Sequence, residues 1–65
     1  MRIGEQLKRA RSQIGKTQEE VANALHVSRQ TISSWENELT YPDINSLLNL
    51  SDYYNLSLDC LLKKK

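Results

Sequence analysis

Cysteine, histidine and proline each occur once in this chain of 65 residues, glycine occurs twice, and phenylalanine is absent. A single cysteine excludes an internal disulfide framework, and one histidine beside it leaves no credible set of metal ligands. No apolar run approaches the roughly 18 residues of a membrane span, and no secretory apolar segment opens the chain. We therefore expect a cytoplasmic protein with no metal, no cofactor and no membrane contact from this segment.

The scarcity of glycine and proline also limits the domain organisation. No linker rich in these residues and no internal repeat divides the sequence, so residues 1–65 are predicted to form one domain. A chain this short buries only about 60% of its unfolded surface, which makes its core marginal. No ionisable partner is placed for acid–base work with His26 or Cys60, and no glycine loop is present to hold a phosphate. The sequence therefore does not predict an enzyme.

The net charge of +1 conceals an uneven distribution of charge along the chain. Residues 1–35 carry six basic and three acidic side chains, residues 36–62 carry five acidic side chains and no Lys or Arg, and three lysines end the chain. This asymmetry is compatible with one surface that faces an anion. Alone it is weak support for nucleic-acid binding. Nucleic-acid-binding domains often have a pI above about 9, and this chain does not.

Apolar residues recur at helical spacing along the chain, and no stretch has the pattern of a strand. The first stripe, which Gly15 terminates, consists of Ile3, Leu7, Ala10 and Ile14. Thr17 and Glu20 have the spacing of a capping box and predict the start of a second helix of about two turns. The inner face of that helix consists of Val21, Ala22 and Leu25.

A third helix is predicted over residues 29–36. Ser28 has the character of an N-cap, and Val27 and Ile32 flank it at the spacing of a hydrophobic staple. Asn37 is predicted to end this helix in the left-handed conformation, which asparagine tolerates better than most residues.

The remainder of the chain predicts two more helices after a loop of sequence "ELTYP". Pro42 closes this loop at the entrance of the fourth helix, whose inner face consists of Ile44, Leu47, Leu50 and Tyr54. Asn55 ends that helix, Ser57 caps a short fifth one, and Leu58 and Leu61 complete the core. The expected fold is therefore all-α, with five short helices.

Residues 18–37 have the organisation of a helix-turn-helix, with two short helices separated by a turn of about three residues. Steeply crossing helices approach closely, and the small residue Ala22 permits that contact. The spacing of Trp35 from Ile32 and Val27 places it on the core-facing side of the helix. This position argues against a role in base stacking. In such a motif the outer face of the second helix is free to enter the DNA major groove.

The sequence resembles the lambda-repressor-like (XRE/Cro-CI) helix-turn-helix family in the segments "LKRAR", "TQEEVANALHVSRQTISSWENE" and "YPDINSLLNLSDYYNLSLDCLL". The resemblance covers nearly the whole chain and implies a compact five-helix DNA-binding domain. Two positions depart from the family pattern. His26 stands in the turn where many relatives have glycine, and Glu38 follows "EN" where glycine is common and adds a negative charge near the expected backbone contacts.

The resemblance places base reading on the outer face of the third helix, at Arg29, Gln30, Thr31, Ser33 and Ser34. Arginine can bond guanine through two hydrogen bonds, glutamine can bond adenine in the same way, and a threonine methyl can contact thymine. The alternative is that these side chains are only the solvated surface of an exposed helix.

The family also implies contacts with DNA phosphates. Gln18 opens the second helix, where free N–H groups and the helix dipole favour an anion. Further phosphate candidates are Lys16, Thr17, Asn37, Thr40 and Tyr41, although Thr17 is chiefly a cap. Arg11 and Glu36 resemble a structural ion pair of the family, and the alternative is that they are two independent surface charges.

These expectations together predict a sequence-specific, repressor-like transcriptional regulator that binds double-stranded DNA. The expected setting is bacterial or phage-type, at the nucleoid, with the third helix in the major groove. The family implies a homodimer on a pseudo-palindromic operator, with Leu58, Leu62 and Tyr53 as candidate dimer contacts. The alternative is a protein-interaction module of the same fold, such as an antitoxin-like or anti-regulator domain. Two further interpretations stay open. The chain is either a whole small regulator or the N-terminal DNA-binding part of a longer protein with a C-terminal effector or membrane domain.

Overall fold

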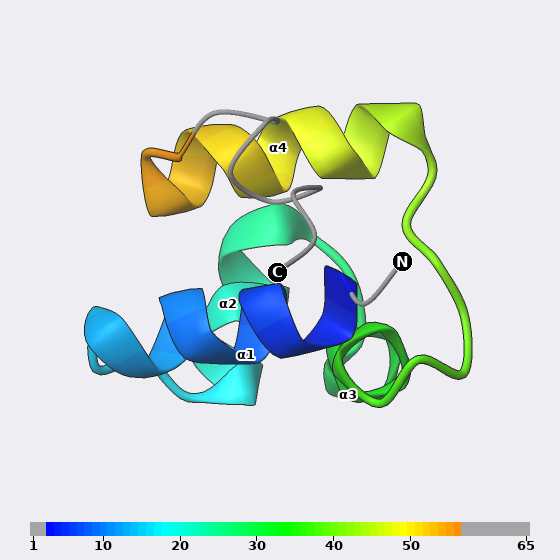
Figure 1. Cartoon of the computed structure of the whole chain (residues 1–65), viewed down its shortest axis with the longest axis horizontal. Helices are drawn as coiled ribbons and strands as arrows, with labels where there is room; N and C mark the ends of the chain where they lie inside the picture. The colour runs from blue at the N-terminus through cyan, green and yellow to red at the C-terminus, as the bar shows by residue number, and fades with distance from the viewer. Residues whose placement is uncertain (1–2, 57–65) are drawn as a thin grey trace.

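The computed structural model describes residues 3–56, which form the four helices α1 (Ile3–Gln13), α2 (Gln18–Leu25), α3 (Arg29–Glu36) and α4 (Ile44–Tyr54). Figure 1 shows α4 along the top, α1 below it, and α3 seen end-on beside the N-terminal end of α1. The all-α prediction is confirmed, but the described residues contain four helices and not five. The predicted fifth helix, with Ser57, Leu58 and Leu61, lies outside the described residues.

The core draws apolar side chains from all four helices. Its buried members are Ile3, Leu7, Ala10, Val21, Ala22, Ile32, Trp35, Leu50 and Tyr54. Each fully buried side chain of the size of Leu7 or Ile32 stabilises the fold by roughly 1.5–3 kcal/mol. The predicted inner faces were wrong at Ile14 and Ile44, which are 43% and 62% exposed. Ile14 follows the last residue of α1 and Ile44 is the first residue of α4, so the apolar spacing there continues beyond the packed part of the helix.

Side-chain oxygens cap the N-termini of α2, α3 and α4, as the sequence predicted for α2 and α3. The Thr17 hydroxyl accepts from the Glu20 N–H at 3.1 Å, and the Glu20 carboxylate accepts from the Thr17 N–H at 2.8 Å. Ser28 accepts from the Thr31 N–H at 3.1 Å. The capping box and the Ser28 cap are therefore confirmed.

The N-cap of α4 is Asp43, and Pro42 lies one residue before it. The Asp43 carboxylate accepts from the Ser46 N–H at 3.1 Å, and hydrogen bonding with Ser46 lowers the pKa of Asp43. The backbone hydrogen bond from Thr17 likewise lowers the pKa of Glu20. Because both pKa values fall on folding, these caps stabilise the protein above the ordinary pKa values of 3.8 and 4.5, and this contribution is lost as the pH falls through the lowered values.

Every described helix is followed by a residue in the left-handed conformation. These residues are Gly15, His26, Glu38 and Asn55, with φ values of 69°, 61°, 64° and 56°. After each of them, an N–H bonds back to a carbonyl five residues earlier, as from Val27 to Ala22 at 3.0 Å and from Leu39 to Ser34 at 2.9 Å. This is the Schellman arrangement, which satisfies carbonyls at the end of a helix.

The prediction that Asn37 is left-handed was wrong, because its φ is −95° and the left-handed residue is Glu38. The Asn37 N–H still bonds the Ser33 carbonyl at 2.9 Å, so helical hydrogen bonding continues one residue further than expected. Glu38 therefore adopts the left-handed conformation at the position after "EN" where glycine is common in the family.

Replacing His26 with glycine is expected to raise the free energy of unfolding by about 0.5–1 kcal/mol. A non-glycine residue at φ 61° is strained by roughly 1–2 kcal/mol, and the greater freedom of glycine in the unfolded chain offsets part of the gain. Urea denaturation measures the difference, with His26→Ala as the control because alanine retains the strain. A His26→Gly protein less stable than the wild type would contradict this explanation of the turn.

The N-terminal end of α1 lies directly against the last turn of α3. A Cβ atom on Gly4 would be 2.5 Å from the Glu36 carbonyl oxygen and 2.7 Å from the Trp35 carbonyl oxygen. These distances are far below contact distance, so only glycine permits this approach. The spacing of apolar residues gives no indication of it, because Gly4 contributes no side chain to the stripe.

Candidate nucleic-acid interface

The outward face of α3 carries the five residues that the sequence analysis assigned to base reading. Ile32 and Trp35 are buried on the inner side and hold the helix on the core. Arg29 and Gln30, in the first turn of α3, are exposed. This face is therefore presented to the solvent at the start of the helix, where a groove-reading helix contacts base edges.

The three smaller side chains of this face are half-buried. The Thr31 hydroxyl lies 2.9 Å from the Ser28 hydroxyl, and the Ser33 hydroxyl accepts from the Asn37 amide at 3.2 Å. Ser34 is half-buried as well. Thr31 and Ser33 therefore have part of their hydrogen-bonding capacity engaged within the protein, whereas Arg29 and Gln30 extend furthest into the solvent.

A buried ion pair joins α1 to the end of α3. Arg11 donates from Nε to Glu36 Oε2 at 2.7 Å and from Nη2 to Glu36 Oε1 at 3.1 Å. The Glu36 side chain is only 1% exposed, and its hydrogen bond with Arg11 raises the pKa of that guanidinium. Burial, with the nearby charge of Glu36, also raises the pKa of Tyr54. The two charges are thus one structural unit and are not independent surface groups.

Gln18 joins the same network from the start of α2. Its amide nitrogen donates to Glu36 Oε1 at 3.1 Å, so Glu36 accepts from both α1 and α2. An amide nitrogen carries two N–H donors, and this bond uses one of them. The side chain that the sequence analysis assigned to phosphate binding is therefore also part of the packing between α2 and α3.

An open hollow of about 400 Å³ lies beside this network, and residues at the starts of both α2 and α3 line it. Its lining consists of Arg11, Thr17, Gln18, Glu19 and Arg29. Lys16 is exposed and its carbonyl accepts from Arg11 Nη1 at 3.0 Å. The charge of Arg11 is offset by its pairing with Glu36, and the carboxylate of Glu19 also lines the hollow. The features that suit an anion are therefore Arg29 and the N-terminal end of the α2 dipole.

The other predicted phosphate candidates, Asn37, Thr40 and Tyr41, follow α3 and are exposed in the loop before α4. Glu38 lies among them, and its Oε2 accepts from the Gly4 N–H at 3.0 Å. From the sequence, Glu38 was expected only as a departure from the family pattern, and its contact with Gly4 was not predicted. No local pattern indicates it, because the two residues are 34 positions apart in the sequence.

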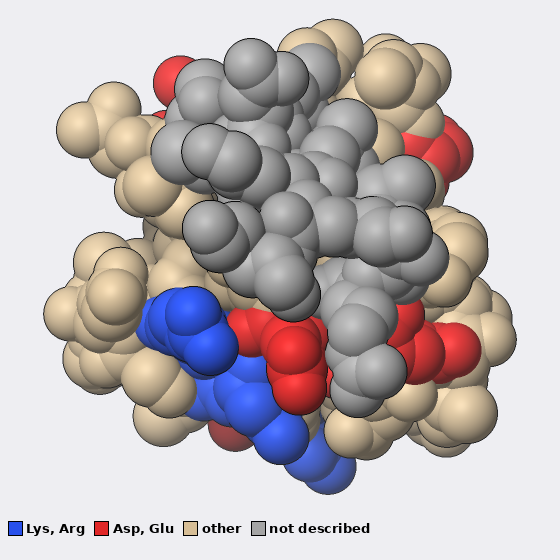
Figure 2. All heavy atoms as spheres, viewed as in Figure 1, with Lys and Arg blue, Asp and Glu red and all other residues tan. Residues whose placement is uncertain are grey.

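The distribution of charge on the surface follows the asymmetry of the sequence. Figure 2 shows basic side chains gathered over α1 in the lower part of the face. The basic residues of α1 are Lys8, Arg9 and Arg11, and α4 contains no Lys or Arg. The basic side chains of the described helices are therefore concentrated on α1 and absent from α4.

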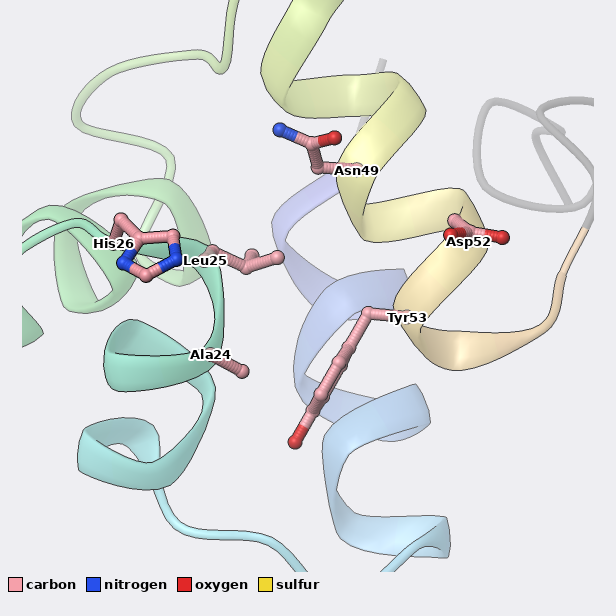
Figure 3. A pocket seen from close by; sticks show the side chains of 6 residues that line it. All are labelled: Ala24, Leu25, His26, Asn49, Asp52 and Tyr53. Carbon is pink, nitrogen blue, oxygen red and sulfur yellow. The ribbon is translucent and has the colours of Figure 1, made fainter.

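A second hollow, of about 250 Å³, lies between the end of α2 and α4 (Figure 3). Its lining consists of Ala24, Leu25, His26, Asn49, Asp52 and Tyr53. The ring of Tyr53 extends from α4 into it and meets the Tyr54 ring edge-on at 5.3 Å. Tyr53, a predicted dimer contact, is thus half-buried, and the other two, Leu58 and Leu62, lie outside the described residues.

Within residues 3–56, no helix is long and apolar enough to cross a membrane. In the same range, no three histidine, cysteine, aspartate or glutamate side chains lie together so as to hold a metal ion.

Two short helices joined by a tight turn, with the second one presenting arginine, glutamine and serine outward, define a helix-turn-helix protein. Residues 7–59 match the protein family described as helix-turn-helix. The chain belongs to the lambda-repressor-like helix-turn-helix family, so the resemblance found in the sequence is confirmed.

Relatives in this family are transcriptional regulators. The HTH-type transcriptional regulator ImmR of Bacillus subtilis (strain 168) is 42% identical over 64 residues, which are 98% of this chain and 50% of ImmR. The HTH-type transcriptional activator BcrR of Enterococcus faecalis is 39% identical over 62 residues, which are 95% of this chain and 30% of BcrR. The chain therefore spans half or less of the length of these two relatives.

A solved structure shares the fold over the whole chain. It is the crystal structure of the P22 c2 repressor protein in complex with synthetic operator 9T in the presence of Tl+. The TM-score is 0.91 at 32% sequence identity, and the match covers 100% of this chain and 98% of that chain.

Proposed function

We propose that this chain is a sequence-specific, double-stranded DNA-binding unit of a repressor-like transcriptional regulator, and that α3 enters the major groove. The observation that carries the proposal is the outward face of α3, where Arg29 and Gln30 are exposed and Ser34 is half-buried on a helix fixed from behind by Ile32 and Trp35. The likeness to a repressor–operator complex supports the same orientation.

Base reading is assigned first to Arg29 and Gln30, because these two are exposed whereas the other three are half-buried. Arg29 has the donors to bond O6 and N7 of a guanine, and Gln30 has the donor and acceptor to bond an adenine. Thr31, Ser33 and Ser34 supply short hydroxyl groups and one methyl group to neighbouring base edges. Each two-hydrogen-bond contact contributes about 1–3 kcal/mol of discrimination against the wrong base.

Phosphate contacts are assigned to both ends of α3. At its start, Gln18 lines the hollow and has a second N–H to offer. The backbone N–H groups of the first turn of α2 and the exposed side chain of Lys16 are further donors there. At its end, Asn37, Thr40 and Tyr41 are exposed, while Thr17 serves chiefly as the cap of α2. Such contacts set the affinity and its salt dependence but carry little sequence information.

Binding is proposed to occur as a homodimer on a pseudo-palindromic operator, with half-sites about 34–36 Å apart. Leu58, Leu62 and Tyr53 are kept as the proposed dimer contacts. The relatives are longer than this chain, so a C-terminal effector domain in the whole protein is part of the proposal. A regulator of this kind acts in the cytoplasm, at the nucleoid, and has no catalytic role.

Replacing Gln30 with alanine is expected to weaken binding to the correct operator by about 1–3 kcal/mol and to leave binding to random DNA nearly unchanged. Gln18→Ala should instead weaken binding to both DNAs by similar factors, because phosphates are common to all sequences. Fluorescence anisotropy with both duplexes measures the four affinities, and Asn49→Ala on α4 serves as the matched amide control. If Gln30→Ala weakened binding to the operator and to random DNA by the same factor, Gln30 would not be a base-reading residue.

A further inference from the structure

We propose that Glu38 is a positioning residue that helps to set the sequence specificity of the chain by fixing the angle between α1 and the reading helix α3. The inference rests on the proposed DNA-binding function. Glu38 touches neither bases nor phosphates in this proposal, and it acts through the α1 clamp, defined as the bonds of Glu36 to Arg11 and of Glu38 to Gly4.

The α1 clamp holds the end of α3 at two separate points on α1. Glu36 accepts from Arg11 Nε at 2.7 Å, and Glu38 accepts from the Gly4 N–H at 3.0 Å. Gly4 and Arg11 are seven residues apart, which places them on one side of α1 with a rise of about 10 Å between them. One attachment leaves two helices free to rotate about it, whereas two attachments at this separation fix their angle.

Close packing strengthens the second attachment. Because Gly4 has no side chain, its Cα lies against the Trp35 and Glu36 carbonyls, which brings its N–H within reach of the Glu38 carboxylate. The N–H groups of the first turn of a helix have no partner inside the helix, and the helix dipole favours a negative charge there. Glu38 thus satisfies a donor of α1 with a charge of the favoured sign.

The backbone of Glu38 explains why the residue matters beyond a single hydrogen bond. Its φ of 64° is a left-handed conformation that favours glycine. A glutamate in this position retains backbone strain that glycine would remove, and it supplies in return the carboxylate that bonds Gly4. The same bond directs the negative charge of Glu38 to the start of α1.

The expected consequence concerns specificity more than general affinity. α3 has eight residues, and its two exposed base-reading residues, Arg29 and Gln30, lie in its first turn, at the end opposite to Glu38. A rotation at the C-terminal end therefore displaces Arg29 and Gln30, and a recognition site tolerates displacements of only about 0.5 Å. Phosphate contacts made by flexible side chains adjust to such a change, so binding to random DNA is affected less.

Two variants separate the hydrogen bond from the charge. Glu38→Gln removes the charge and retains an oxygen that can accept from the Gly4 N–H. Glu38→Gly removes both and relieves the backbone strain, which favours a folded variant. The ratio of operator affinity to random-DNA affinity is measured at 10 °C, where circular dichroism verifies that each protein is folded. Hydrogen exchange of the Gly4 amide reports the bond independently of DNA.

We expect Glu38→Gly to lower the affinity ratio by about tenfold and to speed exchange of the Gly4 amide, while Glu38→Gln stays within about threefold of the wild type. Equal ratios in the wild type and Glu38→Gly, or equal losses in both variants, would overturn the proposal. A wild-type chain that does not distinguish operator from random DNA would instead overturn the proposed function, and this inference with it.

Discussion

Replacing Glu36 with alanine is expected to lower the free energy of unfolding by about 3–5 kcal/mol, the largest effect of any single substitution considered. The Glu36 side chain is 1% exposed and accepts three hydrogen bonds, two from Arg11 and one from Gln18. Its removal leaves a guanidinium that is only 17% exposed without its charge partner. A domain of this size is stable by only about 3–10 kcal/mol, so the loss takes away much of the total.

Urea denaturation of Glu36→Ala measures this loss, and Glu19→Ala is the matched control. Glu19 is exposed in the first turn of α2, so its removal should change stability by only a few tenths of a kcal/mol. The double variant Arg11→Met, Glu36→Leu should recover much of the stability, because no charge is then left without its partner. A Glu36→Ala loss below about 1 kcal/mol would contradict a buried structural pair.

Replacing Gly4 with alanine is expected to destabilise the protein by about 3 kcal/mol, although this change within a helix usually stabilises by about 0.5–1 kcal/mol. The new Cβ would lie 2.5 Å from one backbone carbonyl oxygen of α3 and 2.7 Å from another. Backbone atoms cannot rotate away as a flexible side chain can, so α1 must move off the end of α3. That movement also lengthens the bond from Gly4 to Glu38.

Thermal and urea denaturation of Gly4→Ala test this prediction, with Gly15→Ala as the control. Gly15 has a φ of 69° and nothing within 4 Å of its would-be Cβ, so its substitution reports backbone strain without a clash. We expect the Gly15 variant to lose roughly 1–2 kcal/mol, less than the Gly4 variant. A Gly4→Ala protein as stable as the wild type would show that the two helices are not in direct backbone contact.

Local chemistry explains which parts of the fold were predictable from the sequence. Thr17, Ser28 and the apolar stripes act within one or two turns of their own helix, so their spacing alone identified the helices and most of the core. The ends of helices were less predictable. Asn37 was predicted to be the left-handed residue after α3, but that residue is Glu38, one position later. The sequence did not distinguish them, because either residue could follow the last turn of α3.

Contacts between distant residues could not be predicted from spacing. The pair of Arg11 and Glu36 was expected only through the family resemblance, since 25 positions separate the two residues. The contact of Gly4 with Glu38 depends on the packing of α1 against α3, which no periodicity reports. The candidate site was predictable in its outward face and not in the interactions that hold that face in place.

In vitro selection of random duplexes with this chain, repeated at two salt concentrations, tests the central proposal most directly. We expect one enriched motif, with half-sites whose centres are about 34–36 Å apart, and an affinity that falls steeply as salt increases. Gln30→Ala should relax the selected sequence at one position of each half-site. Recovery of no enriched motif would contradict sequence-specific DNA binding and would favour a protein-interaction module with the same fold.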